Sequence, residues 1–76
     1  MDLRELLKSR DITMEAAAVL AEVDPSTIFR IMAGQSHARP VTIVKLARAL
    51  GIGAQRMSKI CAESWLAAHE DERLSA

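Results

Sequence analysis

The segment from residue 13 to residue 34 constrains the fold most, because it contains start and stop signals for two consecutive short helices. Asp24 precedes Pro25, and an aspartate side chain there can accept hydrogen bonds from the free N–H groups of a first helical turn. Proline suits the first helical position, where its missing N–H loses no partner. Gly34 can end the same helix in a left-handed conformation. The segment therefore predicts an alanine-rich helix over 13–21, a tight turn and a second helix over 25–33.

The second of these helices has two different faces. At 100° per residue, its apolar side carries Ile28, Ile31 and Met32. The opposite side carries Ser26, Arg30 and Ala33, with Thr27 and Phe29 at the edges. A short helix anchored by three apolar residues, with small polar and basic groups outside, suits insertion into a DNA major groove.

This pattern resembles the helix-turn-helix of the lambda-repressor and Cro class, also called the Xre class. That class has an alanine in the first helix, a hydrophobic residue after the turn and two branched apolar residues in the second helix. The matching residues here are Ala18, Val23, Ile28 and Ile31. Leu3, Leu6 and Leu7 are similar to the preceding helix of the class, and RPVTIVKLARALG over 39–51 resembles the following one. The resemblance covers roughly residues 2 to 52.

Two positions depart from the class. Glu22 stands at the turn, where glycine is usual, and a left-handed conformation strains any other residue. Met14 occupies the start of the first motif helix, where the class often has a glutamine that touches a phosphate. The resemblance therefore does not extend to that phosphate contact.

Composition and periodicity predict an all-α fold, a small five-helix bundle. Alanine and leucine dominate, and no run alternates with the period of two expected for a half-buried strand. Besides the motif pair, helices are expected over 2–9, from 40 or 41 to about 50, and over 54–70. The fourth should bury Ile43, Leu46, Ala47 and Leu50, and the fifth Met57, Ile60, Cys61, Ser64 and Ala68. Residues 1–70 are read as one domain, and 71–76 as a frayed polar tail.

The net charge is zero, but the charges are unevenly distributed. Between residues 24 and 60 there are six basic residues and one acid, a local net charge of +5. Local basic surface favours DNA, because contacts with phosphates release condensed counterions. The same basic residues could also lie on ordinary solvent-exposed helix faces. The helix-turn-helix motif favours DNA binding over this alternative.

The resemblance implies specific roles. The residues expected to read bases are Ser26, Thr27, Phe29 and Arg30. Phe29 could instead tuck into the core beside Ile28, and Arg30 could be an ordinary exposed arginine. The residues expected along the DNA backbone, unless the loop is a plain connector, are Gln35, Ser36, His37, Arg39 and Thr42.

Proteins of this class usually read two half-sites as dimers, about 34 Å apart. Trp65 and Leu66 in the last predicted helix are candidates for the dimer contact, since aromatic anchors are enriched at interfaces. Trp65 could equally cap the core, and single exposed leucines are common.

The sequence gives little support for catalytic, metal-binding or nucleotide-binding chemistry. Cys61, the single cysteine, reads as a small buried hydrophobe, and together with His37 and His69 it lacks the spacing of a zinc site. No nucleotide-binding glycine loop, nucleophile arrangement, signal peptide or transmembrane run is recognisable. We expect no enzyme activity, cofactor, metal, membrane or small-molecule substrate.

The sequence favours a DNA-binding regulator, a repressor of the Cro or immunity-repressor kind, binding double-stranded DNA as a homodimer in a bacterial or phage-infected cytoplasm. Two alternatives remain open. One is an antitoxin-like or anti-repressor-like module that binds protein. The other is an architectural factor, such as a recombination directionality factor, that bends DNA.

Overall fold

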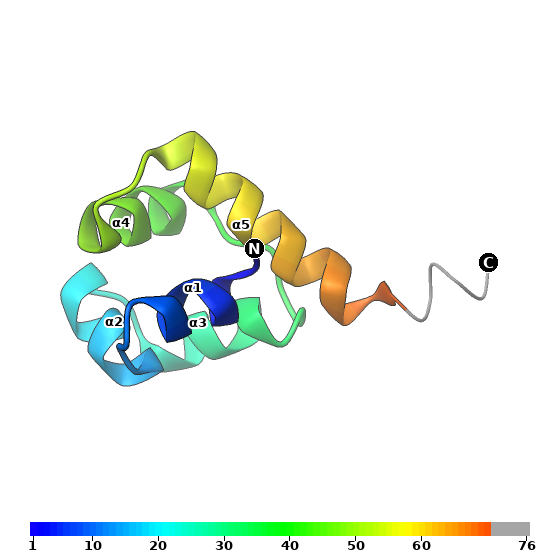
Figure 1. Cartoon of the computed structure of the whole chain (residues 1–76), viewed down its shortest axis with the longest axis horizontal. Coiled ribbons are helices and arrows are strands. Elements are labelled where there is room, and N and C mark those ends of the chain that lie inside the picture. The colour runs from blue at the N-terminus through cyan, green and yellow to red at the C-terminus, as the bar shows by residue number, and fades with distance from the viewer. Residues whose placement is uncertain (71–76) are drawn as a thin grey trace.

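Five α-helices make up the fold in the computed structural model, which describes residues 1–70 (Figure 1). They are α1 (Leu3–Ser9), α2 (Met14–Ala21), α3 (Pro25–Met32), α4 (Pro40–Leu50) and α5 (Ala54–Ala68). The predicted all-α, five-helix architecture is confirmed, and each predicted helix is present to within two residues at either end. The expected polar tail, 71–76, lies outside the described residues.

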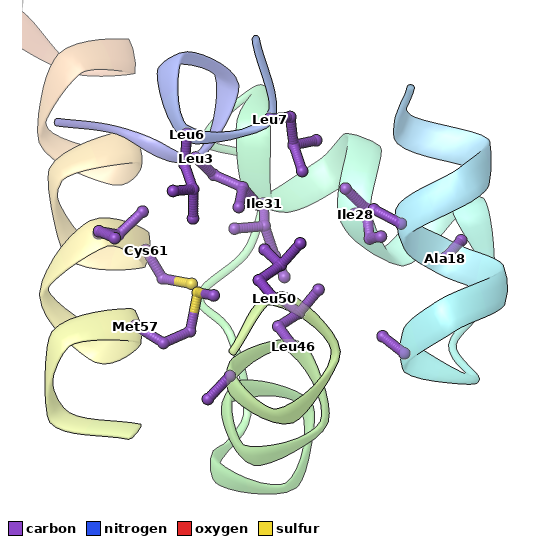
Figure 2. Packing of buried hydrophobic residues seen from close by; sticks show 14 residues of the cluster. Leu3, Leu6, Leu7, Ala18, Ile28, Ile31, Leu46, Leu50, Met57 and Cys61 are labelled. Carbon is purple, nitrogen blue, oxygen red and sulfur yellow. The ribbon is translucent and has the colours of Figure 1, made fainter. Parts of the chain in front are cut away.

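A single hydrophobic core lies where all five helices meet. The labelled side chains of Figure 2 converge there, with Leu3, Leu6 and Leu7 from α1, Ile28 and Ile31 from α3, Leu46 and Leu50 from α4, and Met57 and Cys61 from α5. The helix α2 contributes only alanines, Ala17, Ala18 and Ala21. Small side chains let α2 approach α3 and α4 closely, so this short helix needs no large apolar residue of its own.

The predicted buried faces differ from the observed ones at the ends of two helices. In α4 the buried residues begin at Thr42, and Ile43 is only half-buried. In α5, Ala68 was expected on the buried side and is exposed. Figure 1 shows why Ala68 is exposed: the last turns of α5 extend past the other helices, so they lie beyond the core.

Four helices end with the same left-handed turn. After α3 and α4 the left-handed residues are Gly34 (φ 71°) and Gly51 (φ 68°). After α1 and α2 they are Asp11 (φ 54°) and Glu22 (φ 57°), which lack the conformational freedom of glycine. The expected left-handed conformation of Glu22 is thus confirmed. It redirects the chain from α2 into α3, with the Val23 N–H donating to the Ala18 carbonyl at 3.0 Å.

The start of α1 is attached to α5 by one buried hydroxyl. Ser64 accepts a hydrogen bond from the Leu3 N–H at 2.8 Å and donates to the Ile60 carbonyl at 3.2 Å. Its side chain is 3% exposed, so water cannot replace it as a partner. The serine therefore satisfies one of the first-turn N–H groups of α1 that the helix itself leaves free.

We expect Ser64→Ala to lower the free energy of unfolding by about 1–3 kcal/mol, because it leaves the buried Leu3 N–H without a partner. Urea denaturation followed by circular dichroism measures the change. Ser58→Ala is the matched control, since Ser58 is an exposed serine of the same helix. Equal effects of the two substitutions would contradict the assigned role of Ser64.

We expect Glu22→Gly to raise the free energy of unfolding by about 1 kcal/mol, because glycine adopts the left-handed conformation without steric strain. Ala16→Gly, at an exposed position inside α2, should have the opposite sign and lower it by about 1 kcal/mol. Thermal melting of both variants tests the pair. A destabilised Glu22→Gly protein would show that the turn is not strained.

Candidate nucleic-acid interface

The N-terminus of α3 is built around Asp24. One carboxylate oxygen of Asp24 accepts hydrogen bonds from the Ser26 N–H at 3.0 Å and the Ser26 hydroxyl at 2.9 Å. These two bonds hold the pKa of Asp24 below its usual range, so the carboxylate is ionised at neutral pH. An ionised carboxylate only accepts, so the Ser26 hydroxyl uses its proton on Asp24. Its oxygen lone pairs remain to accept a hydrogen bond from outside.

The outer side of α3 presents the residues that the sequence assigned to it. Ser26, Phe29 and Arg30 are exposed, and Thr27 is half-buried. Phe29 keeps 49% of its surface exposed, so the alternative that buries it beside Ile28 is wrong. The inner side is fixed in the core through Ile28 and Ile31, which are 0% and 2% exposed. The helix thus offers an aromatic ring, a hydroxyl and a guanidinium on a rigid support.

A hollow of about 360 Å³ lies between α3, the following loop and the start of α4. Six of the residues predicted to contact DNA line it, namely Thr27, Arg30, Ser36, His37, Arg39 and Thr42. The hollow combines two guanidinium groups with three hydroxyls and an imidazole. Such a donor-rich, basic surface matches the oxygen atoms of a phosphate group.

The remaining predicted residues lie outside the hollow. Ser26, Phe29 and Gln35 are exposed beside it and do not line it. Thr42 does line it, although the residue as a whole is only 8% exposed. Val41 was not predicted to contribute, but it lines the hollow and is 59% exposed. In the sequence, the only sign that Val41 would line this hollow was its position directly after Pro40, in the first turn of α4.

Sequence reasoning missed a cluster of three aromatic rings at the end of α5. Trp65 stacks on His69 and lies in tilted contact with His37, with centroids 3.9 Å apart in both pairs. The spacing of four between Trp65 and His69 on one helix predicts such a contact. The contact with His37, 28 positions earlier in the sequence, depends on the tertiary fold.

The two residues proposed for dimerisation differ in their surroundings. Leu66 is 46% exposed, as an interface residue would be. Trp65 is half-buried and already stacks on two rings of its own chain. Leu66 is therefore the residue of this pair with free apolar surface.

The two noted departures from the motif have different outcomes. Glu22 adopts the required left-handed turn, as described above. Met14 is half-buried and packs against the core, where glutamine in the class would reach a phosphate. A thioether is a weak acceptor and has no donor, so Met14 provides no phosphate contact.

The cysteine and the other possible metal ligands of residues 1–70 form no metal site. Cys61 is buried in the core, and burial raises the pKa of its thiol to about 11, so it is an unreactive thiol. No three histidine, cysteine, aspartate or glutamate side chains in this part of the chain lie close enough to hold a metal ion. Over the same residues, no helix has the length and apolar character that crossing a membrane requires.

Comparison with known families agrees with the geometry. A family model described as helix-turn-helix matches residues 3–56, which includes α1 to α4 and the start of α5. No curated protein and no solved structure matches the chain. The match spans well over half of the 76 residues, and it includes the turn and the exposed face of α3. The chain belongs to the lambda-repressor-like helix-turn-helix family of DNA-binding regulators.

Proposed function

We propose that this protein is a sequence-specific repressor of the Cro or immunity-repressor kind, which occupies an operator as a homodimer. The observation that carries the proposal is the outer side of α3, where Ser26, Phe29 and Arg30 are exposed while the inner side is fixed in the core. A rigid helix with base-reading groups can enter the major groove without losing its anchoring contacts.

Each exposed group of α3 fits a different feature of the major groove. The Arg30 guanidinium can donate two hydrogen bonds to the O6 and N7 atoms of a guanine. The Phe29 ring can pack on a thymine methyl group. The Ser26 hydroxyl, whose proton is used by Asp24, is left to accept from an exocyclic amino group of adenine or cytosine. Thr27 lies at the edge of the hollow and can reach either a base or a phosphate.

The hollow beside α3 supports a role in backbone contact. Arg39 lines it, together with Ser36, His37 and Thr42. A phosphate of the DNA backbone brings the charge and the acceptor oxygens that these groups can bind. Gln35 is exposed next to the hollow and can donate to the same strand. These contacts set the position of α3 in the groove and carry little sequence information.

A homodimer is proposed because one α3 helix reads only a short stretch of groove. Two copies on half-sites about 34 Å apart double the contacts and make the site specific. Leu66 offers exposed apolar surface for the contact between copies, and Trp65 adjoins it on α5.

We expect Arg30→Ala and Arg39→Ala to change DNA binding in different ways. Arg30→Ala should remove about 1–3 kcal/mol of discrimination at one base pair, because the guanine contact is lost. Arg39→Ala should weaken binding to all sequences alike and reduce the slope of log K against log salt by about 1. Titrations of specific and unrelated duplexes at several salt concentrations measure both effects. Equal loss on both duplexes for Arg30→Ala would exclude it as a base-reading residue.

Selection of randomised duplex DNA tests the proposal as a whole, at about 150 mM salt to suppress purely electrostatic binding. We expect enrichment of an inverted repeat with half-sites about one helical turn apart. Enrichment of direct repeats, with strong bending, would instead indicate an architectural factor. No enrichment by the folded protein would overturn the operator assignment.

A second candidate function is supported by α2. Val19 and Leu20 are consecutive apolar residues of this helix, and they are 77% and 59% exposed. An antitoxin-like or anti-repressor-like module would use such a surface to bind protein. Under that function, Val19→Ser with Leu20→Ser should abolish partner binding and leave DNA binding intact. Under the repressor function, the same double substitution should leave repression from the selected operator unchanged.

A further inference from the structure

The end of α5 contacts the segment that follows α3 at two places. We call residues 34–39 the backbone loop, because four of the residues proposed to contact the DNA backbone lie in it. In the first contact, the His37 imidazole lies tilted on the Trp65 indole, with a centroid distance of 3.9 Å and an angle of 31° between the rings. In the second, Gly34 lies so close to α5 that an added Cβ would overlap the Cβ of Ala68. The two contacts hold both halves of the loop against one helix end.

Trp65 is itself fixed in place by the residue one turn later. The His69 imidazole stacks on the indole at 3.9 Å and 26°. Its Nδ1 atom lies 2.9 Å from the Trp65 carbonyl oxygen. Because a carbonyl only accepts, Nδ1 carries the proton and donates it, which fixes the orientation of the imidazole ring. The indole that the loop packs on is therefore an ordered surface.

The middle of the backbone loop has few other restraints. The Gln35 N–H donates to the Arg30 carbonyl at 2.8 Å, and the Arg39 carbonyl accepts from the Ile43 N–H at 2.9 Å. Between these two anchors, Ser36, His37 and Ala38 make no hydrogen bond to any part of the described residues 1–70. Ala38 packs against the edge of the core. The contact of His37 with Trp65 and the packing of Ala38 are thus the contacts that hold the outer part of the loop.

We propose that Trp65 is a positioning residue for DNA-backbone binding, holding the backbone loop through His37 so that Arg39 and Ser36 face the phosphates. The proposal rests on the proposed DNA-backbone role of this loop. Trp65 and His69 lie beyond residue 56, where the family match ends, so the match itself assigns them no role. It also gives Trp65 a role within one copy, which differs from a contact between copies.

The test compares Trp65→Leu with Trp65→Phe in the full chain. Trp65→Leu should weaken binding to specific and unrelated duplexes alike, by about tenfold, because a charge-assisted contact of the loop is lost. It should also lower the salt slope by up to about 1 and leave the base preference unchanged. Trp65→Phe keeps an aromatic face for His37 and should restore most of the affinity. Gln55→Ala, at an exposed position in the first turn of the same helix that lines neither hollow beside the loop, is the control and should bind like the parent protein.

Coupling with Arg39 separates positioning from general structural support. Arg39→Ala should cost much less affinity in the Trp65→Leu protein than in the parent, because the arginine is already misplaced. Additive losses would overturn the proposal, since Trp65 would then act independently of the loop. A loss confined to inverted repeats, with unchanged binding to a single half-site, would assign Trp65 to the dimer contact and likewise overturn it.

A second variant and a measurement without DNA keep the proposal testable if Trp65→Leu does not fold. His69→Ala removes the ring that orients the indole and should produce a smaller loss of the same kind. Trp65 is the only tryptophan and the chain has no tyrosine, so its fluorescence reports directly on the ring cluster. His37→Ala should change the emission of Trp65 in the free protein, and an unchanged spectrum would contradict the stacking. If the parent protein binds no DNA, the proposed function fails, and the positional role fails with it whatever the spectrum shows.

Discussion

The rest of the structure depends on how α3 is divided between core and solvent. Ile28 and Ile31 are almost completely buried, while Phe29 and Arg30, which lie between them in the sequence, face outward. Burying each isoleucine contributes about 1.5–3 kcal/mol, so the inner side holds the helix in one orientation. The outer side is then free of any structural task. A helix of eight residues keeps its shape and presents this outer side only because its neighbours hold it from within.

The turns around α3 follow from the same requirement. Asp24 caps its start through Ser26, and in doing so it determines that the Ser26 oxygen faces outward as an acceptor. Gly34 ends it with a left-handed turn and also lets α5 come close. The left-handed Glu22 turn before it lets the Val23 N–H donate to the Ala18 carbonyl and turns the chain toward Asp24 and the start of α3. Each turn thus has a local conformational role and a consequence for the surface beside it.

The helix bounds and the inner side of α3 could be predicted from the sequence, because local residue patterns determine them. Capping residues, proline and glycine predicted the helix bounds, and the helical period of apolar residues predicted the inner side of α3. The weaker predictions lie at helix ends. Ile43 fits the apolar period but packs only against the edge of the core and is half-buried. Ala68 fits it too but lies where α5 extends past the core, and it is exposed. Thr42 was assigned to DNA by resemblance, and it lies largely buried at the edge of the hollow.

The sequence by itself determined the five helices, the turn between α2 and α3, and the residues that α3 presents. These depend on interactions within a few residues, which periodicity and capping describe fully. Only the tertiary structure decided that Arg30 and Arg39 share one hollow and that Trp65 supports His37. Those arrangements join residues from α3, α4 and α5, and they depend on how the helices pack. Helix packing is set by the fit of the whole core, which no local pattern encodes.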